Sequence, residues 1–377
     1  MVEPSVVACL TCKNSSLTLP YVLKSLSLIN YPRDRFAVAV VDGGSVDSTP
    51  EVARDILNSL GLKFKVLVKP SNIPEGRNAC VKEALELGAD YILFVDCDTL
   101  VVNKDFLRHA ISASDSGCCP CVVTGDIQVK TFKDVNSLKK FAEETLKNVS
   151  SSPSSKPKGH SFISWCGMGL TLIPAEIARK VSFDEDLTFK EDTVYCLKTW
   201  DAGYGVIKLN YEEPVAYDLN LIRKSDIYVR MSLKDYFRGF SKKALAYAYT
   251  TMTKPGRGGV ISIFKDFRYL SHVTRTFSLT LLSLSLYYLF KADLTLGLLM
   301  FIPAFSMLTL YFSKVLVKSP DVLTAMKSFV KFTLFSFILT FEIPTQAIKH
   351  RSKIKEITHK ITYCEEKMPS YFERPPQ

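Results

Sequence analysis

The chain has 377 residues, of which 47% are apolar and 23% charged, so a disordered protein is excluded and there is room for a large core domain plus a second module. The net charge of +10 is concentrated in residues 223–275, which hold 12 Lys/Arg and 3 Asp/Glu. A basic segment directly before an apolar block favours anionic headgroups and the cytoplasmic side of a membrane. No recognisable nucleic-acid module accompanies it, so we expect no nucleic-acid partner.

Short apolar runs alternate with helical patterns through the N-terminal part of the chain. We expect strands at 6–10, 36–41, 64–68 and 91–95, separated by helices at 19–28, 49–60 and 76–87. This alternation predicts parallel βαβ units and an α/β, doubly wound sheet. Ligands of such sheets bind beyond the carboxyl ends of the strands, so polar residues just after each strand are the candidate site residues.

Segment 150–160 is rich in serine and proline, which predicts a flexible loop that serves either as a lid or as a plain surface excursion. We expect no signal peptide, because the first residues run directly into a strand, and we expect the ten cysteines to be free thiols. Cys9 and Cys12 have metal-ligand spacing, as do the cysteines at 118–121, but packing is the simpler interpretation.

Two uncharged runs, 276–290 and 294–313, predict a helical hairpin, and the second is long enough to cross a bilayer. A third run, 332–341, either spans the membrane or lies in its interface. The tail is basic from Lys349 onward, which favours the cytoplasm and an even number of crossings. Buried helices of a soluble domain are the alternative interpretation.

The strongest local motif is Asp96-Cys97-Asp98 at the exit of the strand 91–95. Carboxylates two residues apart on an extended chain point the same way and repel each other unless a cation lies between them. A divalent cation held also by phosphate oxygens would bind both, whereas an ordinary acidic turn is the alternative.

Three further elements precede or follow this motif. Asp42 leaves a strand into a glycine turn, where its carboxylate can accept hydrogen bonds from a nucleobase or ribose, and Ser48 or Thr49 can cap the next helix. Arg77 and Asn78 lie in the first turns of a helix, a suitable place for a diphosphate. Glu191 and Asp192 open a later helix; Asp192 is a candidate general base, although two acids at a helix start also fit plain capping.

In this order, the four elements resemble the family-two glycosyltransferases of the GT-A fold over about residues 4–240. The resemblance implies an inverting enzyme that uses a nucleoside-diphosphate sugar, uridine- or guanosine-linked, with Mg²⁺ or Mn²⁺ as cofactor. It implies that Asp192 is the catalytic base and that Asp98 ligates the metal. The donor-binding residues that we assign are Thr11, Asp42, Arg77, Asn78, Asp96 and Arg238.

The acceptor site is expected at Gly167, Met168 and Glu191, because segment 165–169 stands where the family shapes that site. The sequence departs from the family at the loop that holds Thr11, which lacks the usual Pro-x-Tyr-Asn. The Gln-x-x-Arg-Trp signature of processive members is also absent, although Arg238 stands at the nearest match and remains a phosphate-binding candidate. Single-sugar transfer is therefore favoured over polymer synthesis.

The expected organisation is a GT-A nucleotide-diphospho-sugar transferase domain followed by an α-helical transmembrane module. Its parts are a catalytic domain at 1–240, a basic juxtamembrane segment at 241–275, transmembrane helices at 276–348 and a basic cytoplasmic tail at 349–377. We expect a multi-pass protein of the cell membrane with a cytoplasmic catalytic domain. The expected acceptor is lipid-linked, for example a polyprenyl phosphate; a processive synthase and a non-catalytic membrane scaffold are the alternatives.

Overall fold

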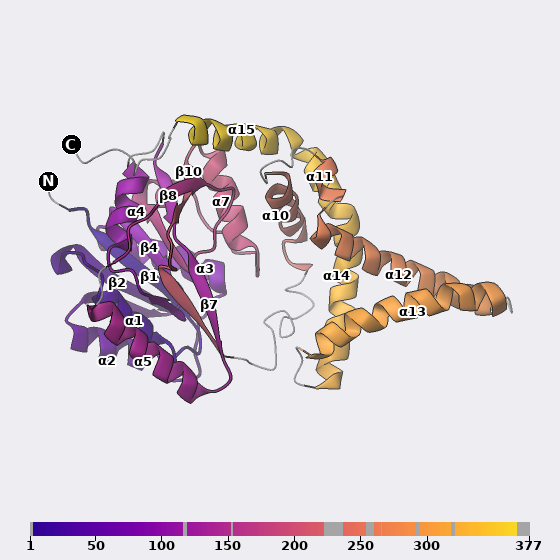
Figure 1. Cartoon of the computed structure of the whole chain (residues 1–377), viewed down its shortest axis with the longest axis horizontal. Coiled ribbons are helices and arrows are strands. Elements are labelled where there is room, and N and C mark those ends of the chain that lie inside the picture. The colour runs from indigo at the N-terminus through magenta and orange to yellow at the C-terminus, as the bar shows by residue number, and fades with distance from the viewer. Residues whose placement is uncertain are drawn as a thin grey trace. The chain divides into compact units, whose positions relative to one another are not determined.

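The computed structural model describes residues 3–115, 119–151, 154–221, 237–253, 260–264, 266–290, 294–317 and 321–367. The chain divides into two compact units. The first comprises Met1–Ile222 together with Glu356–Gln377, and the second comprises Arg223–Lys355. Figure 1 traces both units from the N-terminus to the C-terminus.

An eight-stranded sheet forms the centre of the first unit, in the order β3-β2-β1-β4-β9-β6-β10-β8. Its strands are β1 Val6–Cys12, β2 Phe36–Asp42, β3 Lys63–Val68, β4 Tyr91–Val95, β6 Cys121–Thr124, β8 Gly159–Phe162, β9 Leu170–Pro174 and β10 Gly205–Asn210. The first four strands are parallel, as the sequence predicts. Beyond them the sheet is mixed, because β9 runs antiparallel to both β4 and β6.

Helices cover this sheet and join its strands (Figure 1). They are α1 Leu19–Ser27, the short turn η1 Arg33–Arg35, α2 Thr49–Leu60, α3 Ile73–Glu86, α4 Phe106–Asp115, α5 Val135–Ser151, α6 Ala175–Lys180 and α7 Glu191–Asp201. Helix α3 packs against β1 and β2, and α7 packs against β10. The buried strands β1, β2 and β4 are apolar along nearly their whole length, as expected of strands covered on both faces.

A second, three-stranded sheet lies in the same unit and consists of β5 Thr99–Val101, β11 Ala216–Leu221 and β7 Ile127–Phe132. Its apolar side chains pack with those of α1 and α5 in a separate cluster that contains Tyr21, Leu138 and Leu219. This small sheet was not expected from the sequence. Its strand β5 begins directly after Asp98 and pairs antiparallel with β11, just beyond the carboxyl end of β4.

One helix start and one helix cap differ from expectation. Helix α3 begins at Ile73 because Asn72 and Glu75 form a capping box: the Asn72 side chain accepts from the Glu75 N–H at 2.9 Å, and Glu75 accepts from the Asn72 N–H at 2.8 Å. Helix α2 was expected to be capped by Ser48 or Thr49; among the described residues the Ser48 side chain, at the N-cap position, makes no capping hydrogen bond, and Thr49 is the first residue of the helix. Asp47 accepts from the Thr49 N–H instead.

The expected loop at 150–160 is shorter than predicted. Helix α5 continues through Ser151, residues 154–158 have no regular structure, and β8 begins at Gly159. Residues 152 and 153 lie outside the described part of the chain. Eight of the described cysteines carry free thiols, as expected, but Cys364 is disulfide-bonded, which corrects the expectation for that residue.

The second unit is helical, with α10 Phe240–Met252, α11 Ile261–Phe264, α12 Phe267–Phe290, α13 Leu294–Val317 and α14 Val322–Lys349. Helix α12 packs against both α13 and α14. Much of the basic segment 223–275 lies outside the described residues, namely 223–236, 254–259 and 265. In the expected tail, α15 Arg351–Lys367 is a helix, and from Glu356 onward it belongs to the first unit.

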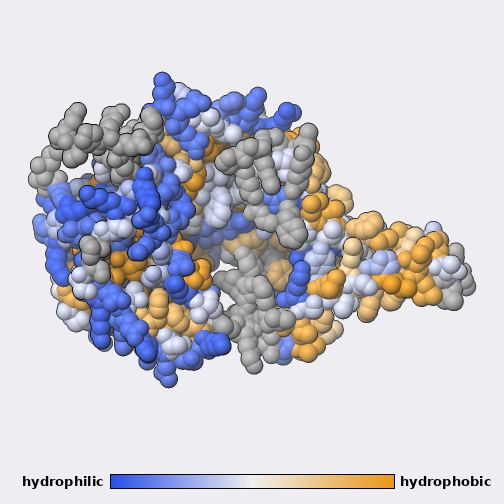
Figure 2. All heavy atoms as spheres, viewed as in Figure 1, coloured by the Kyte–Doolittle hydropathy of each residue, from blue (hydrophilic) through white to orange (hydrophobic). Residues whose placement is uncertain are grey.

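Two helices among the described residues are long and apolar enough to cross a membrane: Leu298–Leu316 within α13, and Val322–Lys349, which is α14. Large apolar side chains are exposed along α13, including Leu299, Ile302 and Leu310, and Figure 2 shows this helix and α12 as the most hydrophobic surface in that view. Helix α12 is not one of these two. It places polar groups against α14: the ring of His272 and the guanidinium of Arg275 both bond to the Ser336 hydroxyl.

Candidate functional site

Three parallel strands bring predicted site residues to one edge of the main sheet. Thr11 lies near the end of β1, Asp42 is the last residue of β2, and Asp96 directly follows β4. The Asp96 N–H donates to the Gly169 carbonyl at 3.1 Å, and the Asp96 carbonyl accepts from the Thr99 N–H at 2.9 Å. These two bonds fix the turn that carries the carboxylate.

Arg77 on α3 lies at the centre of a cluster of acidic side chains. Its side chain is 6% exposed; Nη1 lies 2.8 Å from Glu191 Oε1, and Nη2 lies 3.6 Å from Asp96 Oδ1. Burial lowers the pKa of Arg77, but the carboxylates of Asp96, Glu191 and Asp192 outweigh burial and raise it. The guanidinium therefore joins the turn after β4 to the first turn of α7.

The arrangement makes Asp192 more basic than an ordinary aspartate. Burial, followed by the charge of Glu191, raises the pKa of Asp192 to about 6, whereas Arg77 and the Thr193 N–H, 2.8 Å from Oδ1, act in the opposite direction. The carboxylate lies close to the exposed Gly167: a Cβ on that glycine would lie 3.8 Å from Asp192 Oδ2. A partly buried carboxylate with a raised pKa suits proton abstraction near neutral pH.

Asp98 lies in the turn between β4 and β5 and is partly exposed; its carbonyl accepts from the Leu219 N–H at 2.8 Å. A further carboxylate, Asp218, lies on β11 opposite Thr99, and burial together with the charge of Asp96 raises its pKa. Within the described residues, no three His, Cys, Asp or Glu side chains form a ready metal site. Carboxylate oxygens such as those of Asp98 are nevertheless suitable ligands for Mg²⁺ or Mn²⁺, which commonly take their other ligands from phosphate and water.

Asp42 is completely buried, and its carboxylate is engaged by its own turn. Oδ2 accepts from the N–H groups of Gly44 and Ser45 at 3.1 and 2.9 Å, and Oδ1 accepts from the Ser45 hydroxyl. The residue thus shapes the loop after β2. The predicted contact between Asp42 and a nucleoside stays a prediction.

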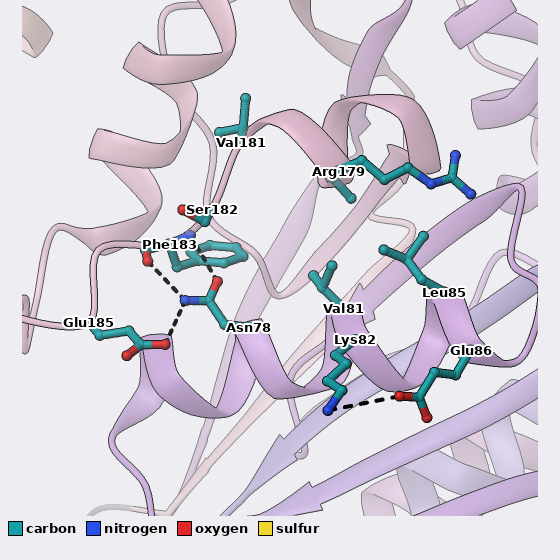
Figure 3. Close-up of a pocket in the computed structure, with 11 residues that line it drawn as sticks. Asn78, Val81, Lys82, Leu85, Glu86, Arg179, Val181, Ser182, Phe183 and Glu185 are labelled. Carbon is teal, nitrogen blue, oxygen red and sulfur yellow. Dashed lines mark hydrogen bonds and ion pairs between the residues drawn. The ribbon is translucent and has the colours of Figure 1, made fainter.

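Asn78 lines a pocket between α3 and segment 178–185 (Figure 3). Its Nδ2 donates to the Phe183 carbonyl at 3.0 Å and to Glu185 Oε1 at 2.9 Å, and its Oδ1 accepts from the Phe183 N–H at 2.9 Å. All three bonds tie α3 to this segment, which also presents the Phe183 ring to the Arg77 guanidinium at 5.5 Å. Donor binding by Asn78 stays a prediction.

The remaining predicted residues lie in different surroundings. Thr11 is partly exposed and closely packed: its Cγ2 lies 3.1 Å from where a Cβ of Gly76 would stand. Met168 is buried, whereas its neighbour Gly167 is exposed. Arg238 is exposed, belongs to the second unit and precedes α10. Its predicted donor contact stays a prediction.

Two residues of this region were missed by the sequence analysis. Asp218 joins it only through the pairing of β11 with β5, strands too short to be recognised in the sequence. Gly169 lies against the Asp96 carboxylate, because an added Cβ would stand 3.3 Å from Asp96 Oδ2. The Gly167–Gly169 spacing was visible in the sequence, but nothing there indicated which side chain approaches.

Comparison with known proteins finds a similarity over the N-terminal part of the chain. Residues 7–170 match the family described as Glycosyl transferase family 2. Procollagen galactosyltransferase 1 of Danio rerio is 33% identical over 129 residues, covering 28% of this chain and 21% of that protein. The inactive glycosyltransferase 25 family member 3 of Homo sapiens is 31% identical over 127 residues, with 28% and 21% covered. The chain thus spans about a fifth of the length of the curated relatives that it matches.

Solved structures resemble this chain with lower sequence identity. Staphylococcus aureus TarS in complex with UDP has a TM-score of 0.43 and 20% identity, with 64% of this chain and 65% of that chain covered. The mannosyltransferase PcManGT of Pyrobaculum calidifontis, in complex with GDP-Man and Mn²⁺, has a TM-score of 0.44 and 14% identity, with 96% and 88% covered. Likenesses this weak carry no argument about function.

The sheet order and the sequence match together indicate the class: the first unit has a GT-A-like mixed α/β fold and is similar to glycosyltransferase domains. The match to glycosyl transferase family 2 covers residues 7–170, which is less than half of the chain.

Proposed function

We propose that this chain is an inverting, metal-dependent glycosyltransferase that moves one sugar from a nucleoside-diphosphate sugar to a membrane-associated, lipid-linked acceptor. The observation that carries the proposal is the cluster of Asp96, Glu191 and Asp192 around the buried Arg77. Asp192 takes the proton of the acceptor nucleophile, whose oxygen attacks the anomeric carbon while the nucleoside diphosphate leaves on the opposite side. One such displacement inverts the anomeric configuration.

Mg²⁺ or Mn²⁺ would be held by Asp98, with Asp96 turned toward the same diphosphate. A metal bound there neutralises the charge of the leaving diphosphate. The test is calorimetric titration of nucleotide sugar with and without Mn²⁺. Asp98→Ala should remove the metal-dependent part of donor affinity, and equal wild-type affinity with and without metal would refute the assignment.

The lipid-linked acceptor is motivated by the two candidate spans in α13 and α14. In this proposal the protein is a multi-pass membrane protein, and its catalytic domain lies on the cytoplasmic side, where the basic segment 223–275 meets anionic headgroups. Several relatives are named for galactosyl transfer to procollagen, so a protein hydroxyl is the second candidate acceptor. Other relatives are named inactive, which makes donor consumption the first thing to establish.

The experiment offers the full chain in detergent a panel of uridine- and guanosine-linked sugars with Mn²⁺. Release of nucleoside diphosphate is measured alone, with a prenyl-phosphate-linked saccharide, and with a collagen-like peptide. Release from one donor that the lipid-linked saccharide stimulates supports the proposal. Stimulation by the peptide alone replaces the lipid with a protein acceptor, and long products would indicate a processive synthase.

A further inference from the structure

The chain has two tryptophans in very different surroundings. Trp200 on α7 is 1% exposed, and its Nε1 donates to the Ile163 carbonyl at 3.0 Å, so it is a core residue. Trp165 is 40% exposed, in the segment just before Gly167. Its indole is a large apolar face presented to solvent.

The segment that carries Trp165 is fastened to α7 beside Asp192. The N–H of the next residue, Cys166, donates to Cys196 Sγ at 3.4 Å, and the two buried sulfur atoms lie 3.7 Å apart. Gly167 follows, with the surface of Asp192 Oδ2 directly next to it. The backbone on one side of the indole is therefore held close to the proposed base.

From the other side, the start of α7 reaches the same indole. Lys190 Nζ lies 5.6 Å from the centroid of the Trp165 ring, and Lys190 immediately precedes Glu191 and Asp192. Lys190 has a left-handed backbone with φ of +69°, which is uncommon for a residue that is not glycine. Such conformations are kept where the surrounding structure dictates them, often at functional sites. The exposed indole and the base thus belong to one surface.

We propose that Trp165 is the stacking platform of the acceptor subsite, and that the acceptor presents a hydroxyl group of a pyranose ring to Asp192. This inference rests on the proposed glycosyl transfer and names its acceptor class. A pyranose has a face of C–H groups that packs on an indole and a rim of hydroxyls that points past it, so a ring on Trp165 would direct one hydroxyl toward the neighbouring carboxylate.

The chemistry of the base favours a hydroxyl over a phosphate as nucleophile. A phosphate monoester is already mostly ionised at neutral pH, since its second pKa is about 6, and needs no proton removed. A sugar hydroxyl must lose its proton as it attacks. Asp192 accepts that proton while the new bond forms between the hydroxyl oxygen and the anomeric carbon, and the diphosphate oxygen leaves with the electron pair of the broken bond. For a lipid-linked acceptor, the lipid would thus already carry a sugar.

A fluorescence experiment tests binding without relying on turnover. In Trp200→Phe, Trp165 is the sole tryptophan, and acrylamide quenching reports its exposure. Methyl glycosides of glucose, galactose, mannose and N-acetylglucosamine are added with nucleoside diphosphate and Mn²⁺. We expect at least one glycoside to protect Trp165 saturably. Protection by citronellyl phosphate or inorganic phosphate, but by no glycoside, would overturn the proposal, as would no protection at all.

If Trp200→Phe does not fold, the difference in quenching between the wild type and Trp165→Phe gives the same information, because the buried Trp200 is poorly reached by acrylamide. Transfer kinetics provide the second readout. Stacking on an aromatic ring contributes binding free energy, so Trp165→Ala should raise the acceptor KM by about ten- to a hundredfold. Trp165→Phe keeps an aromatic ring and should retain most of the affinity. Tyr363→Ala, an exposed aromatic on α15, is the matched control and should leave KM unchanged.

The two proposals fail in different ways. If the wild type transfers sugar but Trp165→Ala has an unchanged acceptor KM, the platform is wrong and the glycosyltransferase proposal stands. If the wild type consumes no donor, the proposed function is wrong, and the quenching experiment still decides whether Trp165 binds a sugar ring.

Discussion

At the scale of single residues, the candidate site depends on how one buried cation is shared among several carboxylates. Arg77 contacts Glu191 at 2.8 Å and Asp96 at 3.6 Å, and among the described residues its buried Nε has no hydrogen-bond partner. A buried ion pair adds little net stability, because both charges lose water, yet removing one partner leaves the other charge uncompensated. The described contacts of Arg77 are therefore those of a residue that positions Glu191 and Asp96, and its contact with the donor diphosphate stays a prediction.

Replacing Arg77 by methionine should destabilise the protein by about 3–5 kcal/mol, because Glu191 would remain buried without its cation. The measurement is the thermal unfolding midpoint of the full chain in detergent. Arg77→Met combined with Glu191→Leu should recover part of the loss. An equal loss in the single and the double variant would contradict the assigned pairing.

The raised pKa of Asp192 predicts a pH dependence. A carboxylate acts as a base only when deprotonated, and burial raises the pKa of Asp192 to about 6. Transfer should therefore be constant above that pH and fall about tenfold for each pH unit below it. In Arg77→Lys, which keeps the charge but loses the paired geometry, this acidic limb should move to higher pH, because Arg77 lowers the pKa of Asp192. A limb that stays near pH 4 would contradict the assignment of the base.

At the scale of elements, the start of α3 determines where Arg77 stands. The Asn72–Glu75 capping box fixes the first turn, and the Asn72 side chain also donates to the Glu185 carbonyl at 2.9 Å. The same helix thus carries Arg77 toward the acids and Asn78 toward segment 178–185. The capping box at the start of α3 therefore helps to set the position of Arg77 in the candidate site.

Asn72→Ala should cost about 1 kcal/mol of stability, within a usual range of about 0.5–2 for lost caps. The unfolding midpoint measures it. Ser48→Ala is the matched control at the start of α2, where the side chain makes no capping bond, and it should change the midpoint very little. Equal effects at both positions would mean that the capping box does not hold α3.

Much of this element-scale structure was predictable. The strands at Tyr91–Val95 and the helix at Thr49–Leu60 follow from local apolar patterns and lie where the sequence predicts them. The small sheet was not predictable, because β5 has only three residues and its partners lie far along the chain. For the same reason the sequence predicted Asp96, Asp192 and Glu191 as site residues but not their shared contact with Arg77, which requires knowing which elements meet.

At the scale of the whole molecule, the chain combines a region that matches glycosyl transferase family 2 with helices that are long and apolar enough to cross a membrane. The predicted hairpin at 276–290 and 294–313 corresponds to α12 and α13, but the candidate spans are α13 and α14. The length of the uncharged run 294–313 correctly predicted that α13 is long enough to cross a membrane. It did not reveal that α12 turns polar side chains toward α14, nor that the third apolar run belongs to a much longer helix.

Membrane association should depend on the surface of α13. Ile302 and Leu310 are 62% and 65% exposed, and a lysine near the middle of a spanning helix costs about 2.5–3.5 kcal/mol on insertion scales. Lysine at both positions should shift the chain out of the carbonate-resistant membrane fraction. The control places lysine at Val129 and Val135, exposed apolar residues of the first unit, and should stay in that fraction. A wild type found in the soluble fraction would contradict the membrane proposal.

The most direct test of the central claim, that Asp192 is the base of a glycosyl transfer, compares wild type with Asp192→Asn, which keeps the shape and removes the base. Nucleoside diphosphate release in the presence of donor and acceptor is measured beside donor affinity by calorimetry, with Asp201→Asn at the other end of α7 as control. We predict that Asp192→Asn lowers transfer by about 10²–10⁴-fold with donor affinity nearly unchanged. Transfer by Asp192→Asn at the wild-type rate would contradict the account.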